Sequence, residues 1–163
     1  MTSAHPPDVR FPSVDARSLT GVDLGLPAGF EGRLVLAVIA FRQEQQRLVD
    51  SWAPHLDLLA GRFDGLRWYE LPVLGRQWAP LRPFIDGGMA RGIADDVVCA
   101  RTLTVYGDVR RVCAPLRITD RTTITVVLTD RSGQIHWRTT GAPTPGSLAA
   151  LERTLASLSP PGT

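Results

Sequence analysis

The chain has 163 residues, of which 44% are hydrophobic, and a formal net charge of +2. Length and composition together predict one globular domain and exclude a disordered chain. No apolar run approaches the roughly 20 residues of a membrane-spanning helix, so stable membrane insertion is not expected. The small net charge argues against a nucleic-acid partner. The first ten residues lack an apolar signal region, so we expect a cytoplasmic protein.

The N-terminal third contains a polar start, a turn-rich stretch and one long apolar run. Residues 1–17 are polar and contain proline, which predicts a flexible segment before a single domain over residues 18–160. Residues 11–33 alternate short apolar pairs with Gly and Pro, which predicts an N-terminal extension made of a hairpin and a loop. The run LVLAVIAF at 34–41 predicts a strand buried on both faces.

Apolar residues then recur at helical spacing and predict a helix over residues 45–60, with Pro54 as a kink. A second strand is expected at 66–71 and a second helix over 78–93. Trp52, Trp68 and Tyr69 are expected in the core. The apolar stripe of the first helix consists of Leu48, Trp52, Leu56 and Leu59.

The C-terminal half predicts shorter elements. Thr144 and Pro145 have the residue types of a helix cap and a first helical position, so a final helix should follow them. We expect Trp137 to be partly exposed and Arg101 to lie in solvent. The other expected elements are strands at 102–106, 123–128 and 134–138, a helix at 109–116, and a turn at 130–133.

This order predicts a three-layer α/β fold with a mixed sheet of four to five strands and helices on both faces. The strand–helix–strand opening requires parallel strands joined by a right-handed crossover. The closing hairpin adds antiparallel strands at one side of the sheet.

Several stretches resemble known families. FPSVDARSLTG and FEGRLVLAVIAF resemble the start of redoxin-type thioredoxin-like proteins, and TITVVLTDRSGQIHWRTTG resembles their late hairpin. The motifs FRQEQQ, VDSW, YELP and MARGI are similar to the assembly-factor family of mitochondrial ATP synthase and its bacterial relatives. The resemblance covers about residues 11–158 and implies a thioredoxin-like fold with an assembly or chaperone-like role.

The sequence departs from working thioredoxins at both halves of the redox site. Thioredoxins and peroxiredoxins place a reactive cysteine after the first core strand, where the start of a helix lowers its pKa. This chain has no cysteine over residues 42–46, which read RQEQQ. Ile124 occupies the position of the cis-proline found beside that site in thioredoxins. We therefore expect no catalytic residue and no cofactor.

In this fold the helix start and the loop before the later core strand form one surface. Backbone N–H groups at a helix start can receive a peptide or an anion, and open α/β sheets bind ligands at this edge. The favoured hypothesis is a non-catalytic protein that binds another protein there, as an assembly or chaperone-like factor. The candidate partner-binding residues are Phe41, Arg42, Gln43, Gln45, Gln46, Arg91, Asp120 and Ile124.

Two alternatives stay open. Cys99 and Cys113 could serve a divergent thiol-redox protein, although their spacing matches neither a C-x-x-C pair nor half of a zinc site. The chain could also be a small-molecule-binding module with a cleft near Arg42. The three histidines have no metal-ligand spacing, so no metal site is expected.

Overall fold

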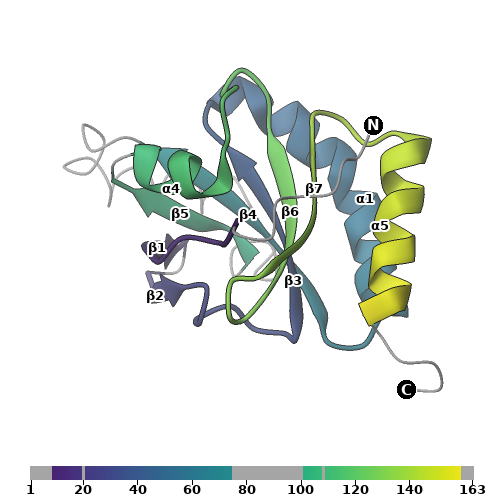
Figure 1. The fold of residues 1–163 in the computed structure, drawn as a ribbon. Helices are drawn as coiled ribbons and strands as arrows, with labels where there is room; N and C mark the ends of the chain where they lie inside the picture. Colours follow the sequence, from purple (N-terminus) through teal and green to yellow (C-terminus); the bar gives the residue numbers. More distant parts are fainter. Residues whose placement is uncertain (1–8, 20, 75–100, 108, 159–163) are drawn as a thin grey trace.

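The computed structural model describes residues 9–19, 21–74, 101–107 and 109–158. Within these residues, seven strands form one mixed sheet in the order β2-β1-β5-β4-β3-β6-β7 (Figure 1). The strands are β1 (Val14–Ser18), β2 (Asp23–Leu26), β3 (Leu34–Ala40), β4 (Leu66–Leu74), β5 (Leu103–Tyr106), β6 (Thr125–Asp130) and β7 (Ile135–Thr140).

The strand β3 lies at the centre of this sheet, parallel to β4 on one side and antiparallel to β6 on the other. Its residues from Val35 to Ile39 are fully buried. Their continuous apolar character allows both faces of the strand to be covered, since no polar side chain has to reach water. The prediction of a strand buried on both faces is confirmed.

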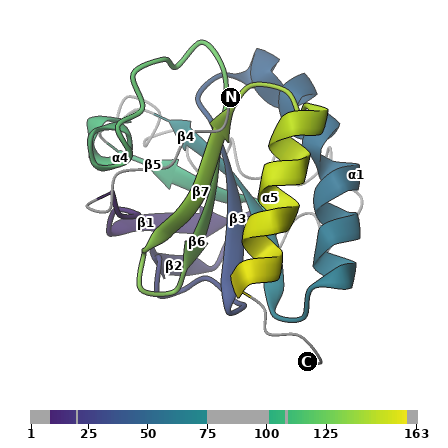
Figure 2. The ribbon, with the colours of Figure 1, turned by 45° about the vertical axis from the view of Figure 1, so that its right-hand side comes forward.

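Helices cover both faces of the sheet. Figures 1 and 2 show α1 (Gln46–Arg62) and α5 (Pro145–Leu158) side by side on one face and α4 (Val109–Leu116) on the other. Side chains alternate along β3, so Leu36 and Val38 pack under α1 and α5, whereas Ala37 and Ile39 face α4. The expected fold class is confirmed. No helix in the described ranges is long and apolar enough to cross a membrane.

The sheet has more strands than the four to five predicted. The expected N-terminal hairpin forms as β1 and β2, but β1 also pairs antiparallel with β5. Arg17 and Ser18 of β1 lie opposite Thr104 and Leu103. The hairpin therefore extends the sheet, because β5 offers an edge with unpaired backbone groups that a further strand can satisfy.

The described part of the N-terminal stretch packs against this sheet. Val9 and Phe11 are buried, and the Phe11 N–H donates to the carbonyl of Gly133 at 2.7 Å. The ring of Phe11 also meets Phe30 edge to face, with centroids 5.4 Å apart. The domain extends at least to Val9 at this end, and a flexible start stays a prediction for residues 1–8, outside the described residues.

The helices agree with their predicted positions where they are described. A one-turn 3-10 helix, η1 (Gln43–Gln45), precedes α1, which is continuous through Pro54. Thr144 Oγ1 accepts from the Ser147 N–H at 3.0 Å, so Thr144 caps α5 as expected. The helix predicted over 78–93 lies outside the described residues.

Two side chains are less exposed than the sequence predicts: Trp137 was expected to be partly exposed and Arg101 to lie in solvent. A register shift in the β6–β7 pairing places Trp137 opposite Leu128, and its ring packs edge to face on Trp52 with centroids 6.3 Å apart. Only 4% of Trp137 is exposed. The Arg101 guanidinium lies 4.3 Å from the Trp68 ring centroid and 3.1 Å from Asp57 Oδ1, because an aromatic face and a carboxylate both attract it.

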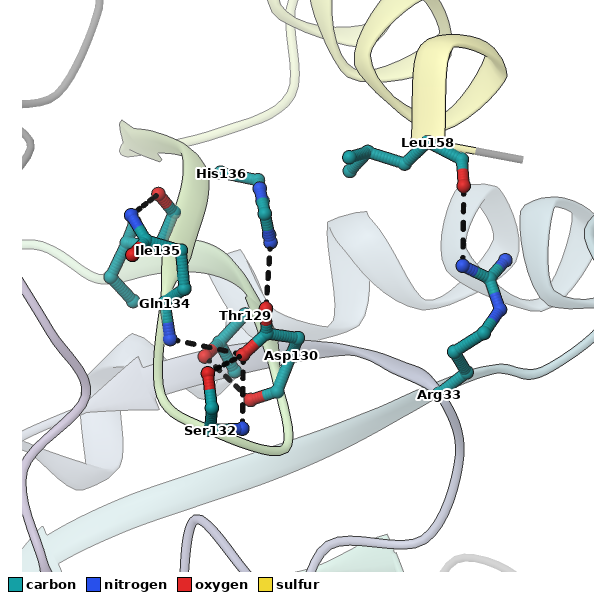
Figure 3. Close-up of polar contacts among 8 residues, drawn as sticks. All are labelled: Arg33, Thr129, Asp130, Ser132, Gln134, Ile135, His136 and Leu158. Atoms are coloured by element: carbon teal, nitrogen blue, oxygen red, sulfur yellow. Dashed lines mark hydrogen bonds and ion pairs between the residues drawn. The ribbon is translucent and has the colours of Figure 1, made fainter. Parts of the chain in front are cut away.

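The turn between β6 and β7 is built around one carboxylate (Figure 3). Asp130 Oδ1 accepts from the Ser132 N–H, the Ser132 hydroxyl and the Gln134 N–H at 3.0, 2.6 and 3.1 Å. His136 Nε2 lies 3.1 Å from Oδ2. Burial by itself raises the pKa of Asp130, but these hydrogen bonds outweigh it and leave the pKa below its ordinary value. The predicted turn at 130–133 is confirmed.

Replacing Asp130 by Ala should destabilise the fold by about 1–3 kcal/mol, because the turn loses several hydrogen bonds to a charged acceptor. Since the folded pKa lies below the unfolded value of about 3.9, this stability is present above that value and is lost as pH falls through the folded pKa. Urea unfolding near neutral pH and below about pH 4 measures both effects.

The matched control is Asp64→Ala, since Asp64 is an exposed carboxylate just after α1. It should change stability by less than about 0.5 kcal/mol. If Asp130→Ala costs no more than this control, the carboxylate does not hold the turn.

Candidate functional site

The predicted binding surface lies where β3 ends. Phe41 and Arg42 lead from β3 into η1 and then α1. The loop of residues 117–124, between α4 and β6, meets them there: Gln45 Nε2 donates to the Arg121 carbonyl at 2.8 Å. The helix start and the loop therefore form one continuous edge, as the sequence predicts.

Gln45 connects the parts of this edge. Its Oε1 accepts from the N–H groups of Phe41 and Arg42 at 2.8 and 3.3 Å, while its Nε2 holds Arg121. Only 3% of the residue is exposed. Gln45 was expected to contact a partner, but its amide is committed to three backbone groups and is buried. Gln45 bonds back to the N-cap N–H as the Glu or Gln of a capping box does, but the N-cap is Arg42, which cannot accept a hydrogen bond with its side chain, so the sequence pattern does not mark this role.

Two other predicted residues also have internal roles. Ile124 is fully buried in the core cluster under α1 and α5, so its side chain offers nothing to a partner. Gln46 is exposed, but its Nε2 donates to Asp50 Oδ1 at 2.9 Å and Glu70 Oε1 at 3.0 Å. Gln46 thus links α1 to β4. Arg91 lies outside the described residues.

The remaining candidates are accessible. Arg42, Gln43 and Asp120 are exposed, and Phe41 is half-buried. Arg121, which no motif marks, is exposed beside them. We call Phe41, Arg42, Gln43, Asp120 and Arg121 the loop surface.

The charges of the loop surface are uneven. Asp120 accepts hydrogen bonds from the side chain and the N–H of Thr122, and these bonds, with a smaller contribution from the charge of Arg42, lower its pKa. This carboxylate is therefore engaged within its own loop. The guanidinium groups of Arg42 and Arg121 are exposed next to a helix start, which itself favours anions. Glu44 of η1 is an exposed carboxylate in the same turn, so the two arginines are local anion-binding groups on a surface of mixed charge.

The loop is held at its other end as well. Arg138 Nη1 of β7 donates to the carbonyl of Leu116 at the end of α4, and burial lowers the pKa of Arg138. The Ile118 N–H then donates to the Cys113 carbonyl at 2.9 Å. Attachment at both ends gives the loop a fixed position relative to α1.

The thiol in the described part of the chain is unsuited to redox chemistry. Cys113 is a free cysteine on α4, 7% exposed, among the apolar side chains between α4 and the sheet. Burial raises its pKa, so it is a protonated thiol and a weak nucleophile at neutral pH. Cys99 lies outside the described residues, so a redox role that uses both cysteines stays an alternative.

The described residues also contain no group of three or more His, Cys, Asp or Glu side chains that could hold a metal ion.

No family model and no curated protein matches the chain. Solved structures do match it. A thiol:disulfide interchange protein from Bacteroides is 16% identical, with a TM-score of 0.61 over 91% of this chain and 89% of that one. Yeast Sco1 with copper bound is also 16% identical, with a TM-score of 0.61 over 93% and 96%. The pneumococcal lipoprotein thioredoxin Etrx1 of Streptococcus pneumoniae is 12% identical, with a TM-score of 0.54 over 89% and 98%.

The chain has a thioredoxin-like fold. At identities this low, the likeness covers the fold alone, and the fold hosts several functions. The resemblance to the assembly-factor family rests on the short motifs of the sequence.

Replacing Gln45 by Ala should destabilise the protein by about 1–3 kcal/mol, because buried backbone groups of both loops lose their partner. Gln43→Ala is the matched control: Gln43 is exposed two residues away and should cost less than about 0.5 kcal/mol. Urea unfolding of the two variants measures the difference. Equal stabilities would mean that water replaces the amide at no cost.

The protein should not reduce insulin disulfides or turn over peroxide, because no thiol stands at the start of α1 and Cys113 is buried. A turbidity assay with insulin and a peroxide-consumption assay, each with dithiothreitol as reductant, test this. A thiol-dependent turnover abolished by Cys99→Ser or Cys113→Ser would show that the divergent redox alternative is right.

Proposed function

We propose that this chain is a non-catalytic thioredoxin-like protein that binds a segment of another protein on the loop surface. The observation that carries the proposal is the amide of Gln45. Its hydrogen bonds to Phe41, Arg42 and Arg121 join the two loops that surround the redox centre in thioredoxins. Because the two loops are joined and carry no thiol, they give a partner a fixed surface to bind and contain no cysteine nucleophile.

The rigidity of this edge supports recognition of an extended segment. A surface that is already ordered loses little conformational freedom when a partner docks, so more of the contact energy appears as affinity. Arg138 holds the chain at Leu116, just before the 117–124 loop, and Gln45 holds the middle of the loop at Arg121.

The charges of the loop surface indicate the chemistry of the partner. Arg42 and Arg121 are exposed guanidinium groups, and Asp120 is engaged by Thr122. Arginine pairs well with carboxylates because its planar donors match both oxygens. A segment that carries Asp or Glu side chains fits this surface.

The finer role that we propose is that of an assembly or chaperone-like factor acting in the cytoplasm. The short motifs that resemble the ATP synthase assembly-factor family support the first part.

Binding of acidic peptides should depend on Arg42. Peptides selected from a displayed library against the wild-type protein should be enriched in Asp and Glu. Arg42→Glu should weaken their binding at least tenfold, because reversing an exposed charge replaces an attraction of roughly 1 kcal/mol with a repulsion. Fluorescence anisotropy at low and high salt measures the affinity and its electrostatic share.

The matched control is Arg153→Glu, the same reversal at an exposed position of α5. It should leave binding within about twofold, and both variants should keep the wild-type melting temperature. If Arg42→Glu and Arg153→Glu weaken binding equally, only net charge is involved and the loop surface is not the binding site.

A further inference from the structure

A basic surface lies next to the loop surface, on the exposed side of α4. Figure 2 shows α4 on the face of the sheet opposite α1 and α5. Residues 109–122, which make up α4 and most of the loop after it, contain four arginines and one acidic residue. The four arginines are all exposed: Arg110, Arg111, Arg117 and Arg121.

The first two of these arginines stand at the end of α4 that suits them least. Arg110 and Arg111 lie in the first turn of the helix, which contains no acidic residue. The helix dipole places positive charge at this end, so basic side chains here are electrostatically unfavourable. Both are exposed, so packing does not require them. Asp108, which precedes the helix in the sequence, lies outside the described residues.

Arg117 stands at a strained backbone position directly after α4. Its φ is 54°, in the left-handed region. Its N–H donates to the Ala114 carbonyl at 3.1 Å, and the Ile118 N–H donates to the Cys113 carbonyl at 2.9 Å. Glycine is the usual residue where a helix ends in this way, because it takes a positive φ without strain. An exposed arginine is therefore present here at a cost to stability.

Arg121 connects α4 with the loop surface. Its backbone is held by Gln45, and its charge acts on the Cys113 thiol, whose pKa it lowers against the larger opposite effect of burial. The Arg121 guanidinium therefore lies near α4. On the other side of the loop, the charge of Arg42 acts on Asp120. The arginines thus form a row from the helix start to α4.

The positive charge of this row is less balanced along α4 than at the loop surface. Beside Arg42, Glu44 is an exposed carboxylate. Within residues 109–122 the one acidic side chain is Asp120, and Thr122 engages it with a hydrogen bond. An anionic partner is therefore attracted to the exposed side of α4 as well as to Arg42.

We propose, resting on the function proposed above, that the acidic segment bound at the loop surface continues along α4 and pairs with Arg110, Arg111 and Arg117. Ala114 is exposed on the same side of the helix, and its small side chain leaves room for the backbone of an extended segment. The eight residues of α4 span about 12 Å, which roughly four extended residues cover. The segment therefore carries two groups of acidic residues, one for each surface.

Two labelled peptides of twelve residues test the extension. One has four Glu residues at each end around a Gly-Ser spacer, and the other has four Glu residues at one end and Gly-Ser elsewhere. Fluorescence anisotropy should show that the peptide with two acidic groups binds about tenfold more tightly or better, since it reaches both surfaces. Added salt should reduce the difference. Equal affinities would overturn the proposal.

Variants of α4 separate binding from stability. Arg111→Glu should weaken the peptide with two acidic groups by about fivefold or more, yet keep or raise the melting temperature, because an acidic residue suits the first turn of a helix. Arg117→Gly should also weaken binding and should raise the melting temperature, because the strain at φ 54° disappears. A residue with only a structural role would not move affinity and stability in opposite directions.

The matched control is Arg153→Glu on α5, an equal charge reversal at an exposed position, which should leave binding within about twofold. If Arg42→Glu weakens binding while Arg111→Glu and Arg117→Gly behave as this control does, the function proposed above stands and the extension along α4 is wrong. If Arg42→Glu also behaves as the control does, both fail.

A single-stranded DNA of twelve nucleotides tests the class of partner. At physiological salt it should bind more weakly than the peptide with two acidic groups. Binding of the DNA as tight as that of the peptide would mean that the arginines attract any polyanion, and would overturn the assignment to an acidic protein segment.

Discussion

The edge of the sheet at the end of β3 depends on the side chain of Gln45. Its amide joins the helix start to Arg121, 76 residues further along the chain. The first N–H groups of a helix lack partners inside the helix, and the approach to α1 would need water or a ligand if Gln45 did not accept from Phe41 and Arg42. The helix start, the end of β3 and the loop before β6 therefore keep one arrangement.

That arrangement separates the thioredoxin-like fold from thioredoxin chemistry. A cysteine at a helix start becomes reactive because the N–H groups and the helix dipole stabilise its thiolate. Here the N–H groups of Phe41 and Arg42 donate to the side-chain amide of Gln45. The thiol of Cys113 is buried between α4 and the sheet. In the described residues this edge holds two exposed guanidinium groups, those of Arg42 and Arg121, and no thiol.

The sequence predicted correctly those elements whose structure depends only on residues close to them in the chain. The apolar run of β3, the Thr144 cap and the turn at Asp130 depend on neighbours within a few residues, and all three are confirmed. The pairing of β1 with β5 is a contact between distant segments, so no local pattern reveals that the hairpin joins the sheet. The burial of Trp137 could not be predicted from local sequence either, because it depends on a register shift in the β6–β7 pairing.

In the candidate site, too, the sequence predicted what depends on local pattern but not which single residues make distant contacts. Sequence reasoning located the edge correctly but treated its polar residues as alike. Gln43 and Gln45 have the same side chain, yet one is exposed and the other is buried with all its hydrogen-bonding groups satisfied. The difference arises from the single turn of η1, which directs Gln45 inward to the loop before β6 and Gln43 outward.

The loop surface and the β1–β2 hairpin differ in how their charged side chains are paired. At the end of β3, the carboxylate of Asp120 is engaged by Thr122, and arginines reach into solvent. At the β1–β2 hairpin, Arg17 is engaged by Asp23, and Asp15 is left uncompensated. A cavity of about 470 Å³ lies over the hairpin and β5, so it depends on the hairpin continuing the sheet beyond β5. The loop surface belongs to the central strands, whereas this cavity belongs to the added hairpin, so each can change in sequence without altering the other.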